Sequence, residues 1–462
     1  MIEEPPGDAG RDTGRDQSHE AAPSSPDKLP VHTETGYPFA AHDIKRGKHR
    51  ADRTFWDAFK QELYADNAFT VTFCAILLAF IFGGVLMIIG SADVRQQWSY
   101  FFYQPLTTLQ ASWDLVSTAY LDMFKGSIFD PQVVQYLYWN IPLPNGATPT
   151  WQMALRPISE TLTNAAPLIL TGLAVAIPFR AGLFNIGGQG QAIMGALAGG
   201  TVGIVLSATG WITIPLAILA GLLAGGLWGY LVGFLKAKTG AHEVILTIML
   251  NYIAFYFMIW FIHQTLVDDP ERTELISKPA HDSAMFPKIL DPSLRANFGI
   301  ILAVIAAGAM AWLLRRGTFG FELRAVGHNP NAASTAGIKV GTTLALTMGL
   351  AGALAGLGGT TMVLGTAQTL TDGIVGQIGF NGILVALLGR VKPWGVVAAG
   401  ILYGALQAGG AAMQTFSGIS NELVTAIQAM IVIFVAAPLL VKAIFRLRRS
   451  PSAAAQEALA KG

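Results

Sequence analysis

Three side-chain amides stand close together in a run of glycines, Phe179-Arg-Ala-Gly-Leu-Phe-Asn-Ile-Gly-Gly-Gln-Gly-Gln191. Asn185, Gln189 and Gln191 can each donate and accept hydrogen bonds, which suits recognition of an uncharged polar molecule rather than acid–base or metal chemistry. The glycines disfavour a continuous helix and predict an unwound corner. If the flanking apolar segments cross a membrane, such backbone must be satisfied by protein or by a water-filled cavity. The corner therefore either lines a solute pathway or makes a polar contact between helices.

Two further clusters combine amides with aromatic rings. Gly376-Gln-Ile-Gly-Phe-Asn-Gly382 repeats the glycine and amide composition and contains Phe380 and Asn381. Asn251 and Tyr252 lie near the middle of another apolar segment. Rings beside amides can stack on and hydrogen-bond a planar base, although aromatic helix faces more often serve packing. We treat these residues, with the three amides above, as candidates for a solute pathway.

Groups for acid–base or metal chemistry are scarce in the apolar segments. The carboxylates Glu160, Glu243, Glu322 and Asp372 fall at segment ends or in loops, and the 8 histidines are scattered. An enzyme would need such groups clustered, and a proton-coupled carrier would place them inside the spans. The phosphate loop Gly-x-x-x-x-Gly-Lys-Ser/Thr does not occur, so we do not expect the chain to hydrolyse ATP itself. We expect no metal and no cofactor in this chain.

The composition indicates a membrane protein. Hydrophobic residues make up 52% of the chain and charged residues 13%, whereas soluble domains carry about 25% charged residues. The net charge of +1 provides no basic field that would attract nucleic acid. The single cysteine, Cys74, excludes an intrachain disulfide and a redox pair of thiols.

The apolar segments predict an all-α polytopic protein with about ten transmembrane helices. Each span needs about 20 apolar residues. Ten windows are available, at 67–89, 161–179, 187–206, 212–235, 242–266, 297–314, 342–364, 377–388, 394–415 and 424–444. The eighth is short and interrupted by glycine, so a broken helix is expected there. Broken helices in both halves suggest an inverted internal repeat, with the site at the repeat interface.

Regularly spaced glycines predict close helix packing. They recur every fourth residue at Gly221, Gly225, Gly229 and Gly233, and again at Gly352 and Gly356. Such a face lets two helix backbones approach each other closely.

The two ends of the chain differ from the rest. Residues 1–53 are rich in Pro, Gly and polar residues without apolar periodicity, which predicts a disordered cytoplasmic tail. Residues 54–66 follow a basic cluster and place apolar residues at helical spacing, which predicts an amphipathic helix on the membrane surface, or else a loosely ordered connector. The transmembrane domain then covers 67–446, and 447–462 form a C-terminal tail.

The distribution of lysine and arginine predicts the orientation. If the N-terminal basic cluster is cytoplasmic, strict alternation places every short basic loop on that side. The long loop 267–295, which carries several carboxylates, lies on the other side. Ten crossings with both termini in the cytoplasm satisfy this arrangement.

One short polar segment between two spans carries its own helix caps. Asn329 suits the N-cap, Pro330 the first helical position and Gly337 the left-handed position after the helix end. A helix of about two turns is not stable alone. The segment is therefore either a connector or an element that docks onto a partner, and the predicted orientation places it in the cytoplasm.

Three runs together resemble one known family. They are 179–191, quoted above, then Gly240-Ala-His-Glu-Val-Ile-Leu-Thr-Ile-Met-Leu-Asn-Tyr-Ile253 and Phe321-Glu-Leu-Arg-Ala-Val-Gly-His-Asn-Pro-Asn-Ala-Ala333. These runs resemble permease subunits of bacterial ABC importers in the branched-chain amino acid and simple sugar group, and most of all the nucleoside-importer permeases. The resemblance extends from about Phe69 to Ile444. Where such permeases often carry Glu, this chain has Gln189.

The resemblance implies a permease subunit in the bacterial plasma membrane that moves nucleosides or otherwise simple sugars. It makes the capped segment the coupling helix, with matching positions at Arg324, Asn329, Pro330, Ala332, Ala333 and Gly337. The implied partners are a cytoplasmic ABC ATPase that uses ATP and Mg, a second permease of different sequence, an extracytoplasmic substrate-binding lipoprotein and membrane lipid. The alternative is an ion-coupled secondary transporter of a small polar solute, which needs no ATPase.

Overall fold

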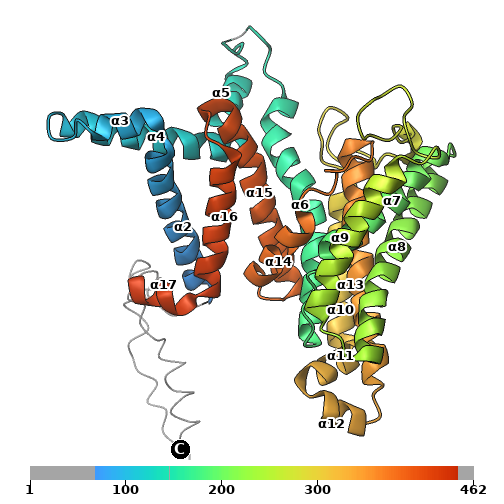
Figure 1. The fold of residues 1–462 in the computed structure, drawn as a ribbon. Coiled ribbons are helices and arrows are strands. Elements are labelled where there is room, and N and C mark those ends of the chain that lie inside the picture. The colour runs from blue at the N-terminus through green and yellow to red at the C-terminus, as the bar shows by residue number, and fades with distance from the viewer. Residues whose placement is uncertain (1–67, 145, 446–462) are drawn as a thin grey trace, which may run out of the picture. The chain divides into compact units, whose positions relative to one another are not determined.

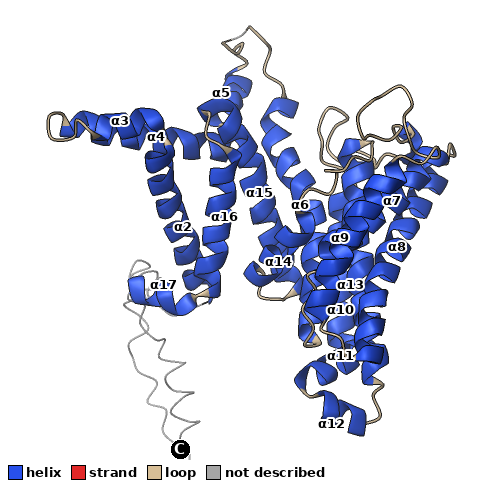
Figure 2. Cartoon of the chain, in the orientation of Figure 1, coloured by secondary structure: helices blue, strands red, loops and turns tan. Residues whose placement is uncertain are grey.

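A computed structural model describes residues 68–144 and 146–445, which are helical apart from loops and isolated β-bridges (Figures 1 and 2). Within these ranges seven helices are long and apolar enough to cross a membrane. They are α2 (Ala68–Gly90), α6 (Trp151–Arg180), α8 (Gly210–Thr239), α9 (Glu243–Ile262), α10 (Gly299–Arg316), α13 (Val340–Met362) and α15 (Pro393–Ser417). The predicted tails 1–53 and 447–462 and the predicted surface helix 54–66 lie outside the described residues.

The other three predicted windows also contain helices. These are α7 (Gly188–Val205), α14 (Ile378–Leu388) and α16 (Asn421–Ala436). The 11 residues of α14 reach about 16 Å, roughly half of a hydrocarbon core of about 30 Å. The fold class is confirmed, while the count of about ten crossings stays a prediction.

The prediction of one continuous span at 424–444 is wrong. The helix ends at Ala436, and Pro438 begins a separate short helix, α17 (Pro438–Ile444). Proline has no amide hydrogen to donate and disfavours the helical conformation of the residue before it, so the helix breaks at this point.

Helix α6 is the most deeply buried of the seven candidate spans. Its most apolar window is 78% buried, compared with 28% for α8 and for α10. It packs against α10, α13, α14 and α15. Three prolines, Pro157, Pro167 and Pro178, lie inside this helix. Each proline deprives the carbonyl four residues earlier of its usual helical donor, so these carbonyls need other partners.

Helices α8 and α13 pack backbone against backbone, as the glycine spacing predicts. A Cβ atom on Gly225 would overlap the carbonyl oxygen of Gly352, and one on Gly229 would overlap that of Met348. Conversely, a Cβ on Gly352 would overlap the carbonyl oxygen of Gly225. The glycine faces of the two helices are therefore in direct contact, and neither tolerates a side chain at these positions.

The remaining elements lie at the two ends of the bundle (Figure 1). One end carries α11 (Thr318–His328) and α12 (Pro330–Thr335). The other end carries α3 (Ala92–Trp98), α4 (Pro105–Ser127), α5 (Pro131–Trp139) and the short η1 (Asp282–Ala284). At this end α13 continues as the π-helix η2 (Val363–Ala367). The segment 263–298 binds to it there, because Phe286 N–H donates to the Leu364 carbonyl at 2.8 Å.

We predict that Gly225→Ala lowers the thermal midpoint of the detergent-solubilised protein, because the methyl group forces the backbones of α8 and α13 apart. The neighbouring variant Gly226→Ala is the control, since its nearest atoms would lie at 3.4 Å. That variant should be neutral or should gain up to about 1 kcal/mol from helix propensity. Size-exclusion chromatography after heating measures both midpoints. Equal midpoints for the two variants would contradict the packing described.

Candidate functional site

The unwound corner between α6 and α7 is organised by Asn185. Its side chain is fully buried, and its Nδ2 donates to the carbonyl of Ala174 at 3.1 Å. That carbonyl lies four residues before Pro178, which has no amide hydrogen to offer it. The Asn185 Oδ1 accepts from the N–H of Gly187 at 3.0 Å. The asparagine therefore replaces the helical donor that proline removes and fixes the backbone of the corner.

Gln191 completes the buried amide pair. The Asn185 Nδ2 donates to Gln191 Oε1 at 3.0 Å, and the Gln191 Nε2 donates back to Asn185 Oδ1 at 3.2 Å. Both side chains have no exposed surface. A reciprocal amide pair of this kind satisfies its own polar groups, which is what buried polar side chains require.

Helix α9 supplies a second set of contacts to the corner. The Asn251 Oδ1 accepts from Gly190 N–H at 2.8 Å, and its Nδ2 donates to the carbonyl of Ile186 at 3.0 Å. Thr247, one turn earlier, packs on the corner so closely that a Cβ on Gly187 would lie 3.0 Å from its methyl group. Residues four apart share one helix face. The face of α9 that carries Thr247 and Asn251 therefore packs along the corner.

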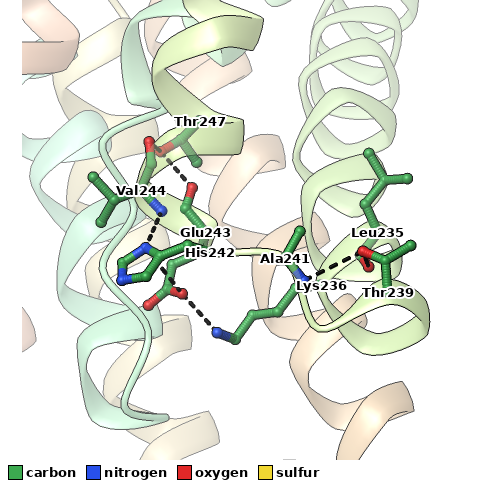
Figure 3. Close-up of polar contacts among 8 residues, drawn as sticks. All are labelled: Leu235, Lys236, Thr239, Ala241, His242, Glu243, Val244 and Thr247. Carbon is green, nitrogen blue, oxygen red and sulfur yellow. Dashed lines mark hydrogen bonds and ion pairs between the residues drawn. The ribbon is translucent and has the colours of Figure 1, made fainter.

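The same face of α9 begins at an ion pair. Lys236 extends from the end of α8 to Glu243, with 2.6 Å between Nζ and Oε2 (Figure 3). The His242 Nδ1 accepts from Val244 N–H at 3.3 Å and caps the start of α9. The ion pair therefore closes the α8–α9 turn one helical turn before Thr247, which packs on the corner.

The N-termini of α7 and α14 meet beside this corner. The Gln189 Nε2 donates to the carbonyl of Gly376 at 2.6 Å, and its Oε1 accepts from Gly379 N–H at 3.0 Å. The Thr171 hydroxyl donates to the carbonyl of Ile378 at 3.0 Å. Two helix N-termini from different halves of the sequence therefore contact each other directly.

The structure separates the seven predicted pathway residues into three groups. Asn185, Gln191 and Asn251 are buried and paired within the protein, which agrees with the polar contact between helices that the sequence left open. Gln189 and Asn381 are half-buried, and Asn381 accepts from the hydroxyl of Tyr403 at 3.3 Å.

The third group consists of Phe380 and Tyr252, which are exposed by 42% and 64%. Phe380 follows Gly379 at the junction of α7 and α14, whereas Tyr252 follows the inward-facing Asn251 and its ring is not among the corner contacts. Thr171 contacts the start of α14 and Glu243 pairs with Lys236 at the start of α9, and neither was recognised as a site residue from the sequence. Pro178, seven residues before Asn185, is the sequence feature that indicates a carbonyl in need of a substitute hydrogen-bond donor.

The capped segment forms the short helix α12, which directly follows α11. The Asn329 Oδ1 accepts from the N–H groups of Asn331 at 3.0 Å and Ala332 at 3.1 Å, Pro330 begins α12, and Gly337 has a φ of 86°. The predicted caps are confirmed. Ala333 is buried, whereas Ala332 is exposed. Only one of the two alanines is therefore free to face another molecule.

Helix α11 rests on the end of α6. A Cβ on Gly327 would overlap the carbonyl oxygen of Arg180 and lie 3.0 Å from Ala181 Cα. The half-buried Arg324 lies one turn earlier on α11. The backbone at the start of the corner is thus in van der Waals contact with the segment that precedes α12.

The side chain of Arg180 contacts a different element. Its Nε and Nη2 donate to the carbonyl of Val391 at 3.0 and 2.9 Å. Arg390 and Val391 have φ values of 53° and 57°, which residues other than glycine rarely adopt. Arg180 therefore stabilises the strained loop that follows α14. A continuous set of contacts runs from α12 through α11 to the corner and to the far end of α14.

Comparisons with known proteins agree with this arrangement of motifs. Residues 158–436 match the family described as "Branched-chain amino acid transport system / permease component". The guanosine ABC transporter permease protein of Bacillus subtilis is 40% identical over 60% of this chain and 80% of its own length. The nucleoside ABC transporter permease protein of Lactococcus lactis is 38% identical over 62% and 81%. The glucose ABC transporter permease protein of Haloferax volcanii is 32% identical over 60% and 75%. No solved structure matches the chain.

We predict that Asn251→Leu destabilises the protein, because it leaves Gly190 N–H and the Ile186 carbonyl without their partners. The expected cost is about 1 to 3 kcal/mol. Tyr252→Leu is the matched control, since it changes the adjacent exposed side chain of the same helix. Thermal unfolding in detergent measures both variants. If Asn251→Leu unfolds at the temperature of the unmodified protein, the corner does not depend on this contact.

Proposed function

Since this chain belongs to the branched-chain amino acid transport system permease family and is an ABC transporter permease subunit, we propose that the solute it imports is a nucleoside. The observation that carries this proposal is the identity of 40% and 38% with permeases named for guanosine and nucleosides, across four fifths of their lengths. The relative named for glucose is 32% identical, so a sugar is the competing solute.

We assign the pathway to the junction of α7 and α14. Gln189 and Asn381 are the half-buried amides there, and Phe380 is the exposed ring between the Gly379 contact and Asn381. An amide can hydrogen-bond the edge of a base while a ring stacks on its face. The buried amides Asn185, Gln191 and Asn251 do not contact the solute in this proposal. They fix the backbone that carries Gln189.

We predict that vesicles containing the complete transporter take up labelled guanosine in the presence of ATP, and that Phe380→Ala raises the KM for guanosine. Loss of a stacked ring costs about 1 to 3 kcal/mol, which is a factor of about five or more. Phe416→Ala is the control, since Phe416 is an exposed ring at the C-terminal end of α15. Uptake of glucose in place of guanosine would refute the nucleoside assignment and leave the permease role intact.

We propose that α12 is the coupling helix and that it docks onto a separate cytoplasmic ABC ATPase, which uses ATP and Mg. The short helix is fixed by Asn329 and presents the exposed Ala332. Movement at α12 can reach the pathway by the contacts of Gly327 with Arg180 and of Arg180 with Val391. The orientation follows, because ATP is hydrolysed in the cytoplasm and α12 lies at the end of the bundle opposite α3 and α4 (Figure 1).

The remaining partners in this proposal are a second permease subunit of different sequence and an extracytoplasmic substrate-binding lipoprotein. Both termini are cytoplasmic in the bacterial plasma membrane, with the segment 263–298 on the outside. The family membership supports a multi-subunit transporter in general, and the distribution of basic loops supports the orientation.

We predict that Ala332→Glu prevents association with the ATPase and abolishes ATP-driven uptake, because it brings an unpaired charge into a closely packed contact. Thr239→Glu places the same charge on the exposed α8–α9 turn and should leave both intact. Co-purification of the ATPase with the tagged permease measures association, and we expect a loss of at least about tenfold. Normal association, or uptake by this chain with only an ion gradient, would refute the coupling role.

A further inference from the structure

The hairpin of α3 and α4 precedes the region that the family model matches, which begins at residue 158. It is a fixed unit rather than a loose loop. The Trp98 Nε1 donates to the Ser112 hydroxyl at 3.1 Å, and the Thr108 hydroxyl donates to the carbonyl of Gln97 at 3.2 Å. Ser91 caps α3 directly after the end of α2. The hairpin therefore has a defined direction relative to α2.

That direction is across the end of a membrane span. Figures 1 and 2 show α3 and α4 lying across the end of α2 rather than continuing along it, at the end of the bundle opposite α12. Helix α2 is the most apolar of the seven candidate spans. A helix that lies across the end of a membrane span runs along the membrane surface.

The projecting half of α4 has two exposed faces of opposite polarity. Leu106, Leu109 and Trp113 lie on one face and are 80%, 50% and 71% exposed. Thr107 and Asp114 lie on another face and are also exposed. A helix with this division lies at the boundary between apolar and polar phases.

The turn between α3 and α4 carries an aromatic cluster, Trp98-Ser-Tyr-Phe-Phe-Tyr103. Trp98 stacks on Phe101 with 5.2 Å between ring centroids, while Phe102 and Tyr103 are 94% and 87% exposed. Trp and Tyr are enriched at membrane–water interfaces, where the ring is apolar and its polar atom reaches water. The cluster places the end of the hairpin at this level of the bilayer.

An apolar groove of about 440 Å³ lies in the angle between α2 and α4. Ile81 and Val85 of α2 form one wall, and Leu109 and Trp113 of α4 form the other. The α2 wall belongs to a membrane span, so the groove opens at hydrocarbon depth. In that phase the available occupant is an acyl chain.

We propose that the α3–α4 hairpin is an interfacial anchor that lies at the headgroup level of one leaflet, with an acyl chain of a phospholipid in the α2–α4 groove. The leaflet is the outer one under the orientation proposed above. The other half of α4 packs tightly on α15, where a Cβ on Gly409 would lie 2.6 Å from the Met123 side chain. The anchor thereby sets the depth of α15, which carries Tyr403 at the pathway.

The depth of two exposed positions on α4 tests this proposal. In a Cys74→Ser background, a nitroxide spin label is attached to Leu109→Cys or to the control Thr107→Cys. The full chain with its partner subunits is reconstituted in vesicles of phosphatidylcholine and phosphatidylglycerol. Oxygen concentrates in hydrocarbon and a nickel chelate stays in water, and electron paramagnetic resonance measures collisions with each. We expect oxygen to dominate at position 109 and nickel at position 107.

Two results would overturn the proposal. Domination by nickel at both positions would mean that the hairpin stands in water. Low accessibility to both reagents at position 109 would mean that protein covers the groove, such as a second permease subunit. Trp113→Cys, one turn further along the same face, repeats the measurement if the label at position 109 disturbs the hairpin.

Discussion

A bilayer core offers no water to backbone groups, so each break in a helix at membrane depth needs a partner from the protein itself. In this molecule the decisive case is the carbonyl of Ala174, which loses its helical donor at Pro178 and receives Nδ2 of Asn185 instead. Once that contact is made, the chain can leave α6, turn and begin α7 while the Ala174 carbonyl keeps a donor. Asn251 satisfies the next part of the turn from α9.

The three sequence motifs all form or contact this turn. The first motif forms the corner, the second supplies the face of α9 that follows it, and the third ends in Gly327 against Arg180. Residues far apart in the sequence thus contact a few consecutive peptide units. Because Arg180 also binds the carbonyl of Val391, a displacement of α11 acts on the corner and on the loop after α14 together.

Much of the fold could be predicted because bilayer helices follow composition. All ten apolar windows contain helices, and local chemistry was sufficient for the caps of α12. The break before α17 was missed even though Pro438 is visible in the sequence, because the apolar composition continues across it.

Features that depend on distant partners could not be predicted. Asn251 pairs with a backbone 61 residues away, and the burial of Ala333 beside the exposed Ala332 depends on how α12 packs. Periodicity alone also could not decide whether the amides of the corner line a solute pathway or make a polar contact between helices. The geometry assigns Asn185 and Gln191 to the contact and leaves Gln189 at the junction with α14.

The glycine contact between α8 and α13 also has a consequence for biosynthesis. The face of α8 ends at Gly233, and its complement on α13 starts roughly 110 residues later in the chain. At a translation rate of roughly 5 to 20 residues per second, the ribosome needs about 6 to 22 s to complete that stretch. During this interval α8 has no matching surface, and its glycine face meets lipid or the neighbouring α7 and α9. Pairing of α8 with α13 therefore depends on α8 not associating with other nascent membrane proteins before α13 is synthesised.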